Sequence, residues 1–218
     1  MRYSFQSVLP GVVLAPCPLG PGWGAVDAAM TLVQAERLAV FDTGVRAYMP
    51  AALEPALTAL GKGLTDLDVI VNTHGHWDHV RAAPAFAELT GVTPHLAPED
   101  DFLWHQVNGD SPYRPVRDGQ RFSVAGHSLV ALRTPGHTPG STSYWLETAT
   151  TVFTGDTLFE GGPGATRWAY SSFERIIDSI TTRLFPLGDE VVVNTGHGPA
   201  TTIGAERPHL QEWLDRGW

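Results

Sequence analysis

The chain has 218 residues and a formal net charge of −9 at pH 7, from 14 Lys and Arg against 23 Asp and Glu. With 43% hydrophobic and only 17% charged residues, it is a folded chain rather than a disordered one, and its length suits a single domain. The acidic balance argues against nucleic acid or a membrane surface as a partner, and the lone Cys17 excludes an intrachain disulfide and a multi-cysteine zinc site.

The N-terminal apolar stretch does not resemble a signal peptide or a membrane span. Between Val8 and Leu19 it is interrupted by Pro10, Pro16 and Pro18. A signal peptide needs a continuous apolar run of about 7–15 residues, and a spanning helix needs about 20. We therefore predict a cytoplasmic protein that acts on a small-molecule substrate.

Short apolar segments bounded by Gly and Pro predict strands, and longer periodic segments predict helices. In the first half we expect strands at Val12 to Leu14, Ala28 to Gln34, Leu38 to Phe41 and Val69 to Val71, and helices at Ala51 to Leu60, Asp78 to Leu89 and Pro98 to Val107. In the second half we expect strands at Leu129 to Leu132, Ser143 to Leu146, Thr151 to Phe153 and Val191 to Val193, and helices from Phe173 and at Ala205 to Asp215. Ser171 and Glu174 have capping-box spacing before the helix from Phe173. The two similar halves, with no low-complexity linker, predict one domain over residues 1–218 with two sheets packed face to face and helices outside.

The main chemical motif directly follows the predicted strand Val69 to Val71. It reads Thr73-His74-Gly75-His76-Trp77-Asp78-His79 and contains four potential metal ligands within six residues. Imidazole and carboxylate are the groups that zinc and similar divalent ions prefer. Gly75 is expected to let the backbone bend between the first two histidines. One turn of this kind can supply ligands to two metal ions.

Three further motifs place a metal-type ligand after a buried strand. His137 lies in Pro135-Gly136-His137-Thr138, Asp156 in Thr154-Gly155-Asp156-Thr157, and His197 in Thr195-Gly196-His197-Gly198. A single histidine after a strand is more often structural, but three such motifs together with the first one indicate a metal centre. His95, His105, His127 and His209 match no ligand motif, and we predict that they are surface or structural residues.

The order and spacing of these motifs resemble the metallo-β-lactamase superfamily. The resemblance also covers Phe41-Asp42-Thr43-Gly44, which matches an early aspartate of that family. It implies an α+β fold, a four-layer αββα sandwich, with a dinuclear site at one edge. By the same resemblance the first metal is bound by His74, His76 and His137 and the second by Asp78, His79 and His197, with Asp156 as the bridge. Asp42 is implied to orient a ligand rather than to bind metal.

Two divalent ions about 3.5–4 Å apart can share a water, lower its pKa to about 7 and present hydroxide at neutral pH. We expect two such ions, zinc first, with iron or manganese as alternatives. Asp78 is the candidate catalytic residue because its position beside the bridge allows it to orient that hydroxide and to carry a proton.

Within the superfamily the chain is most similar to short glyoxalase II-like hydrolases, which cleave acyl-glutathione thioesters. The segments that carry this similarity are His76 to His79, Gly155 to Phe159 and Gly196 to Gly204. We expect no C-terminal helical domain of the kind that helps classical glyoxalase II to hold glutathione. The Lys and Tyr contacts to glutathione are also missing after Phe159, so another thiol carrier or another ester stays open.

Several loop residues near the expected mouth of the site are candidate substrate contacts. Arg167 is a candidate for binding a carboxylate, and the candidates for an apolar wall are Trp23, Trp77, Phe159, Trp168 and Tyr170.

Two alternatives use the same ligand set. A lactonase would use the dinuclear site unchanged, and a persulfide dioxygenase would use one iron bound by two histidines and one aspartate. A β-lactamase of the common zinc class is ranked low because it usually has Cys where Asp156 stands.

Overall fold

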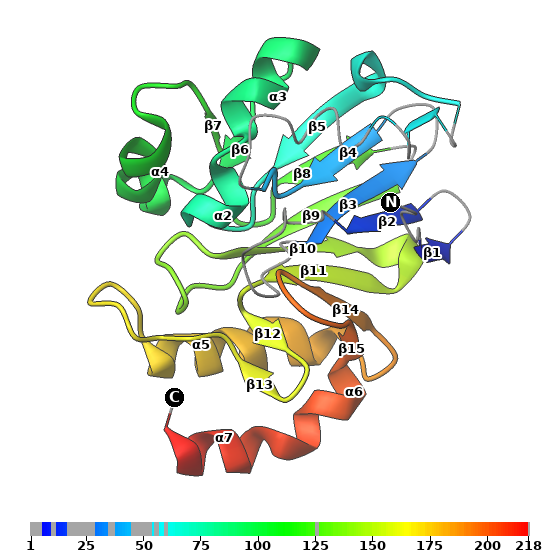
Figure 1. Cartoon of the computed structure of the whole chain (residues 1–218). Coiled ribbons are helices and arrows are strands. Elements are labelled where there is room, and N and C mark those ends of the chain that lie inside the picture. Colours follow the sequence, from blue (N-terminus) through cyan, green and yellow to red (C-terminus); the bar gives the residue numbers. More distant parts are fainter. Residues whose placement is uncertain are drawn as a thin grey trace, which may run out of the picture.

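A computed structural model describes residues 6–9, 12–16, 29–34, 38–44, 54, 57–58, 61–124 and 127–217. Within them, two β-sheets lie face to face and helices cover both outer faces, so that four layers follow one another in Figure 1. This is the αββα sandwich expected from the sequence. Most of the predicted helix at Ala51 to Leu60 lies outside the described residues.

The first sheet has the strand order β1-β2-β3-β4-β5-β6-β7. Its strands are β1 Gln6–Leu9, β2 Val12–Pro16, β3 Ala29–Gln34, β4 Leu38–Phe41, β5 Leu67–Val71, β6 His95–Leu96 and β7 Arg114–Pro115. Its outer layer contains α2 Trp77–Val80, α3 Ala83–Thr90 and α4 Asp101–Asn108.

The second sheet has the strand order β15-β14-β11-β10-β9-β8. Its strands are β8 Arg121–Val124, β9 His127–Arg133, β10 Thr142–Leu146, β11 Thr151–Gly155, β14 Val192–Thr195 and β15 Thr201–Thr202, and a separate hairpin is formed by β12 Leu158–Phe159 and β13 Gly162–Pro163. Its outer layer contains α5 Phe173–Ser179, continued by a π-helical turn at Ile180–Leu184, with α6 Ile203–Glu206 and α7 Leu210–Arg216.

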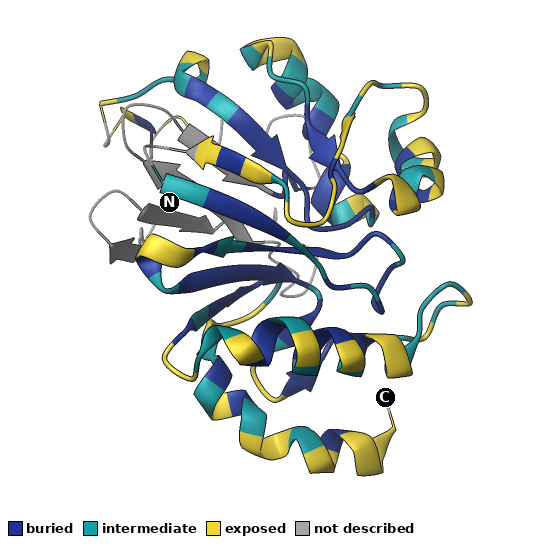
Figure 2. Ribbon diagram, turned by 180° about the vertical axis from the view of Figure 1, so that it is seen from behind, coloured by how far each residue is buried: buried dark blue, intermediate teal, exposed yellow. Residues whose placement is uncertain are grey.

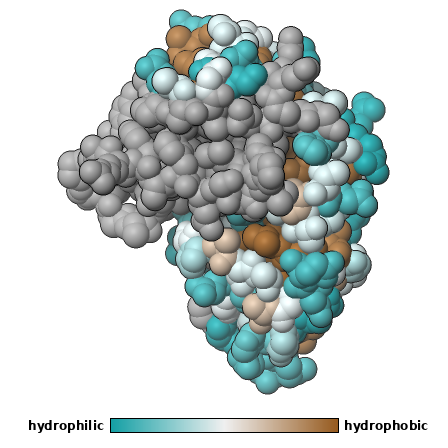
Figure 3. Space-filling model, turned by 90° about the vertical axis from the view of Figure 1, so that its right-hand side faces the viewer, coloured by the Kyte–Doolittle hydropathy of each residue, from teal (hydrophilic) through white to brown (hydrophobic). Residues whose placement is uncertain are grey.

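Three clusters of buried side chains hold the layers together, and the buried residues run through the middle of the molecule in Figure 2. Between the sheets, Val69 and Val71 of β5 pack with Phe122, Leu129 and Tyr144 of the second sheet. A second cluster joins α5 and α7 to the outer face of the second sheet, and it contains the apolar side chains of Ile176, Ile177 and Ile180. A third joins α2, α3 and α4 to β6. On the face drawn in Figure 3, the lower helical layer is mostly hydrophilic, which fits helices that turn their apolar sides inward.

Strand direction brings the ends of distant segments to one edge. In the second sheet β10 is antiparallel to both β9 and β11, and β11 is parallel to β14, so β9, β11 and β14 share one direction. In the first sheet β4 and β5 are also parallel. The loops after these strands therefore leave each sheet from the same end, and these are the loops with the predicted ligands.

Two sequence predictions were wrong in detail. The helix predicted over Asp78 to Leu89 is two helices, because the N–H of Ala82 donates to the carbonyl of Gly44 at 2.9 Å and a new helix begins with Pro84 in its first turn. The cap of α5 is Ser172, whose hydroxyl accepts from Arg175 N at 3.2 Å, whereas the Ser171 hydroxyl donates to the carbonyl of His137 at 2.7 Å. In the described part of the chain, no helix has the length and apolar character needed to cross a membrane.

Candidate metal centre

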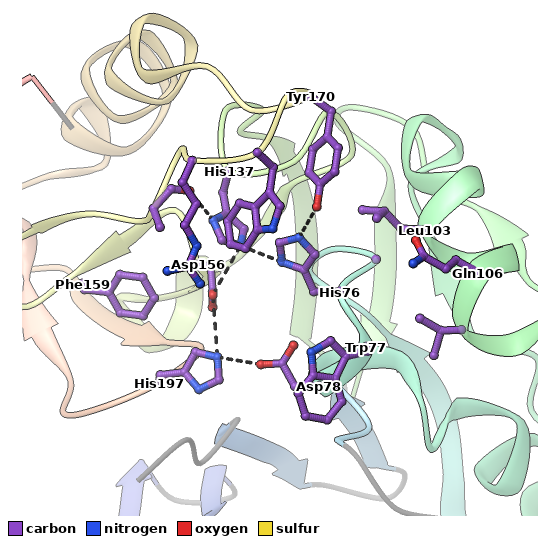
Figure 4. A pocket seen from close by; sticks show the side chains of 15 residues that line it. His76, Trp77, Asp78, Leu103, Gln106, His137, Asp156, Phe159, Tyr170 and His197 are labelled. Carbon is purple, nitrogen blue, oxygen red and sulfur yellow. Dashed lines mark hydrogen bonds and ion pairs between the residues drawn. The ribbon is translucent and has the colours of Figure 1, made fainter. Parts of the chain in front are cut away.

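The loops at the shared edge bring all seven predicted ligands together. His74 and His76 lie in the turn after β5, and Asp78 and His79 lie in the short helix α2. His137 follows β9, Asp156 follows β11 and His197 follows β14. Figure 4 shows side chains from these separate elements pointing into one pocket.

Three imidazole nitrogens converge in a first group, made of His74, His76 and His137. His76 Nδ1 lies 3.0 Å from His74 Nε2 and 2.9 Å from His137 Nε2. A second group is made of Asp78, His79 and His197. Within it, His197 Nε2 lies 3.2 Å from His79 Nε2 and 3.2 Å from Asp78 Oδ2.

Asp156 lies between the two groups. Its Oδ2 atom is 3.4 Å from His137 Nε2 of the first group and 3.6 Å from His197 Nε2 of the second, and its Oδ1 atom is 3.5 Å from His79 Nε2. Four ligands placed tetrahedrally at about 2.0–2.1 Å from zinc lie about 3.3 Å from one another. The separations within the cluster are close to this value, so the seven side chains can bind metal.

The hydrogen bonds around the cluster show which nitrogen of each imidazole ring carries the proton. His137 Nδ1 lies 2.8 Å from the carbonyl oxygen of Ala165, which can only accept, so this nitrogen carries the proton. His79 Nδ1 lies 2.9 Å from Asp42 Oδ2 and donates to that carboxylate in the same way. In the neutral rings of His137 and His79, the inward Nε2 therefore carries a lone pair.

The same reasoning applies to His74. Thr73 Oγ1 lies 2.9 Å from Asp42 Oδ2 and donates its proton there, so it accepts from His74 Nδ1 at 3.0 Å. His76 is held by Tyr170, whose hydroxyl lies 2.8 Å from Nε2. The inward lone pairs of His74, His79 and His137 cannot bond to one another, and a cation between them satisfies them.

Two buried polar atoms of the cluster also lack a hydrogen-bond partner among the described residues. They are Asp156 Oδ1 and His197 Nδ1. A buried carboxylate oxygen without a hydrogen-bond donor is costly, because the charge contact with His79 Nε2 at 3.5 Å replaces only part of the lost hydration. A divalent ion beside Asp156 Oδ1 removes this cost, which is a further sign that the residues fit a metal.

Charge within the cluster is unevenly distributed. Burial and the neighbouring imidazoles lower the pKa of His74 well below its usual value and lower that of His76 to about 3. Burial alone would also lower the pKa of His79, but the carboxylates of Asp42 and Asp156 raise it to about 10. The second group therefore attracts positive charge, in the form of a proton or of a metal ion.

Asp42 contacts the cluster from behind, as the family resemblance implied. Its carboxylate accepts from the N–H of Thr73 at 2.7 Å as well as from the Thr73 hydroxyl and from His79. Asp42 is buried and has φ of 48°. It holds the first ligand turn and His79 in place without facing the pocket.

Gly75 has a different role from the bend expected in the sequence. It does not have the left-handed φ that favours glycine, but a Cβ atom there would lie 2.8 Å from Leu103 Cβ and 3.0 Å from Asp100 Cβ. The turn after β5 therefore requires glycine because α4 packs directly against it.

A cavity of about 640 Å³ opens next to the cluster. Five of the predicted substrate residues line it, namely Trp77, Phe159, Arg167, Trp168 and Tyr170, whereas Trp23 lies outside the described residues. The sequence did not single out Leu103, Gln106 and Val107 of α4, which form another wall (Figure 4 labels Leu103 and Gln106). The apolar positions of α4 indicated a helix, but not that the helix faces a cavity.

The remaining histidines lie away from the cluster. His95 is buried in β6, with Nδ1 3.1 Å from the carbonyl of Ile70. His105 contacts Asp101, His127 contacts Thr148, and His209 contacts Glu212.

Comparison with known proteins agrees with this geometry. The model of the metallo-beta-lactamase superfamily matches residues 23–197. The chain belongs to this superfamily. Hydroxyacylglutathione hydrolase GloC from Haemophilus influenzae is 36% identical over 157 residues, which cover 65% of this chain and 74% of that protein.

Two solved structures of this fold are similar over most of the chain. The crystal structure of TTHA1623 in a di-iron-bound form has a TM-score of 0.72 and 28% identity, and the match covers 88% of this chain and 96% of that one. The crystal structure of ETHE1 from Myxococcus xanthus has a TM-score of 0.71 and 28% identity, and the match covers 96% and 83%. The protein is thus a metal-binding member of a superfamily of hydrolases.

Proposed function

We propose that the protein is a dinuclear metallohydrolase that cleaves a thioester. The observation that supports this most directly is the arrangement of two adjoining ligand groups that share Asp156 at the bottom of an open cavity. The similarity to GloC supports the thioester as the bond that is cleaved. The first group would hold one ion and the second group the other, with zinc as the first candidate.

When bound, two such ions supply Lewis acidity, which lowers the pKa of water and polarises a carbonyl. The chain's own contribution begins with Asp78, which lines the cavity. Burial raises the pKa of Asp78, but the hydrogen bond with His197 and the nearby His79 outweigh burial and hold it well below its usual range. As a carboxylate, Asp78 orients the attacking water and accepts its proton. The water oxygen adds to the acyl carbon and the carbon–sulfur bond breaks. The proton that Asp78 accepted passes to the leaving sulfur, so a carboxylic acid and a thiol are released.

The walls of the cavity suit a substrate that is apolar near the scissile bond and anionic farther away. The ring of Trp168 lies 4.6 Å from that of His76 and stacks with Tyr170 at an interplanar angle of 5°. Among the described residues that line the cavity, Arg167 is the only Lys or Arg, and its guanidinium lies 4.8 Å from the Trp168 ring. In the described part of the chain, Arg167 has no carboxylate partner. We propose that it binds a carboxylate of the acyl-thiol substrate.

A persulfide dioxygenase is a second candidate because one subset of the cluster has the composition that such chemistry needs. His74, His79 and Asp156 also lie close enough to share one ion. Two histidines and one carboxylate are a typical site for non-haem iron in oxygenases. A lactonase stays a third candidate, since it would use the full cluster in the same way.

Elemental analysis of the purified protein, combined with a substrate panel, separates these functions. The panel contains carboxylate-bearing and neutral thioesters, a lactone, a chromogenic β-lactam and glutathione persulfide. We expect about two metal ions per chain and fastest turnover of a carboxylate-bearing thioester. His137→Ala is expected to abolish turnover, and the exposed His209→Ala serves as the matched control. One iron per chain with oxygen consumption on the persulfide would refute the hydrolase in favour of the dioxygenase.

A further inference from the structure

Asp100 is a buried carboxylate at the start of α4 that belongs to none of the ligand motifs. It precedes α4 in the chain, but its side chain does not cap that helix. Instead, Oδ2 accepts from the N–H of Gly75 at 2.7 Å and from the hydroxyl of Thr138 at 2.7 Å. Oδ1 accepts from the N–H of Gly140 at 2.6 Å. The residue is 0% exposed.

These three donors belong to the two chain segments that carry the first ligand group. Gly75 lies between His74 and His76, and Thr138 directly follows His137. A single carboxylate thus connects a turn 25 residues before it with a loop 38 to 40 residues after it. Because one segment contains His74 and His76 and the other contains His137, the distance between the two segments sets the distances between the imidazoles of the first group.

Both segments approach Asp100 through glycine. A Cβ atom at Gly75 would lie 3.0 Å from Asp100 Cβ, and a Cβ atom at Gly140 would overlap the Asp100 carboxylate. The backbone is therefore close to the carboxylate on both sides. Burying a carboxylate is costly unless its oxygens are hydrogen-bonded, and here three short hydrogen bonds from the ligand segments offset that cost.

We propose that Asp100 is a positioning residue that holds His74 and His76 at the correct distance from His137 for metal binding. It is neither a ligand nor a catalytic residue, because it does not line the cavity. This inference rests on the proposed metal centre. We expect Asp100 to affect metal binding at the first ligand group but not at the second.

The test is a zinc titration against a chromophoric chelator for the Asp100→Asn variant. Asn has nearly the same shape, but its NH₂ group faces one of the three donors from which the carboxylate accepted a hydrogen bond, so two donors oppose each other. His197→Ala isolates the first group and His137→Ala isolates the second. In the His197→Ala background, Asp100→Asn should weaken zinc binding about 10- to 100-fold, as expected for residues that orient ligands. In the His137→Ala background it should leave zinc affinity unchanged.

The matched control is Glu206→Gln. Glu206 is also buried and accepts from a backbone N–H, that of Gly161 at 2.9 Å, and from the hydroxyl of Thr201, at 2.6 Å, but it does not contact a ligand loop. We expect similar losses of thermal stability for both metal-free variants but weaker first-group binding only for Asp100→Asn. Should Asp100→Asn not fold, Thr138→Val removes one of the three donors and should weaken first-group binding about threefold.

Equal first-group affinities for wild-type and variant, or equal losses at both groups, would overturn the role of Asp100 alone. Wild-type protein that binds no zinc would instead overturn the proposed metal centre. The two failures are therefore distinguishable in one set of titrations.

Discussion

Replacing Asp42 by Asn tests whether the metal centre depends on the tautomer of a single histidine. The carboxylate accepts from the Thr73 N–H at 2.7 Å, from the Thr73 hydroxyl at 2.9 Å and from His79 Nδ1 at 2.9 Å. An amide has one oxygen and one NH₂ group. If its oxygen faces Thr73, its NH₂ group faces His79 Nδ1, which must then give up its proton and carry it on Nε2. That proton points into the cluster, where the lone pair is needed.

The magnitude follows from the lost contacts. One buried hydrogen bond to a charged acceptor is lost and the His79 ring must change its tautomer, which together cost about 2–3 kcal/mol of unfolding free energy in the metal-free protein. Zinc affinity at the second group should fall about 10- to 100-fold, because the proton on His79 Nε2 must move away before the ion binds. The first group should be affected less, since Asp42 reaches His74 only through the Thr73 hydroxyl.

The assay combines urea denaturation of the metal-free protein with zinc competition titrations. Asp118→Asn is the control, because Asp118 accepts from Arg133 N at 2.9 Å and pairs with Arg183 at a half-exposed site away from the cluster. If Asp42→Asn binds two zinc ions with wild-type affinity, the assignment of lone pairs to the inward nitrogens is refuted.

Three further predictions address pH, substrate and packing. In the metal-free protein, burial lowers the pKa of His76 to about 3, so unfolding free energy is lost as the pH falls below the usual value of 6.5, where the unfolded chain takes up the proton more readily. The pKa of His79 is raised to about 10, so its contribution to the unfolding free energy is complete below pH 6.5 and is lost as the pH rises to 10. Unfolding free energy should therefore be greatest near pH 6.5, and a steady rise from pH 7 to 9 would contradict these shifts. Arg167→Gln should raise KM for a carboxylate-bearing thioester about three- to tenfold while leaving a neutral thioester unaffected, and equal effects on both in steady-state kinetics would exclude carboxylate binding. Gly196→Ala would place a Cβ atom onto Asp156 Oδ1 and 3.0 Å from His79 Cε1, so we expect loss of bound metal by elemental analysis, whereas Gly63→Ala, with nothing nearer than 3.9 Å, should retain it.

The clustering of the seven candidate ligands was predictable because each of their motifs follows a strand that is itself recognisable. The run Val69 to Val71 is buried and apolar, and a motif of four ligands cannot be packed into a core directly after it. The same holds for Asp156 after β11 and for His197 after β14. To predict that these side chains converge, the directions of the strands must be known. The family resemblance supplied these directions, and the local sequence did not.

The features that the sequence did not reveal depend on contacts between distant segments. The break after α2 is caused by the hydrogen bond from Ala82 to Gly44, which no local pattern indicates. Strands β6 and β7 have two residues each and form only because the neighbouring strand is already in place. Asp100 stands in a sequence typical of a helix start, so nothing marks it as an acceptor for two remote loops.

Two buried aspartates outside the ligand set thus appear at different points of the cluster and act differently. Asp42 contacts a ligand side chain directly and selects its tautomer, so its effect depends on charge and on the direction of one N–H bond. Asp100 contacts no ligand side chain and binds backbone and hydroxyl groups beside three ligands, so its effect depends on distance. The charged contacts of His79 belong to the second group, whereas the first group consists of imidazoles whose outer nitrogens contact neutral oxygens. The second group therefore depends on electrostatics and the first on geometry, which is why substitution of either aspartate should weaken one group much more than the other.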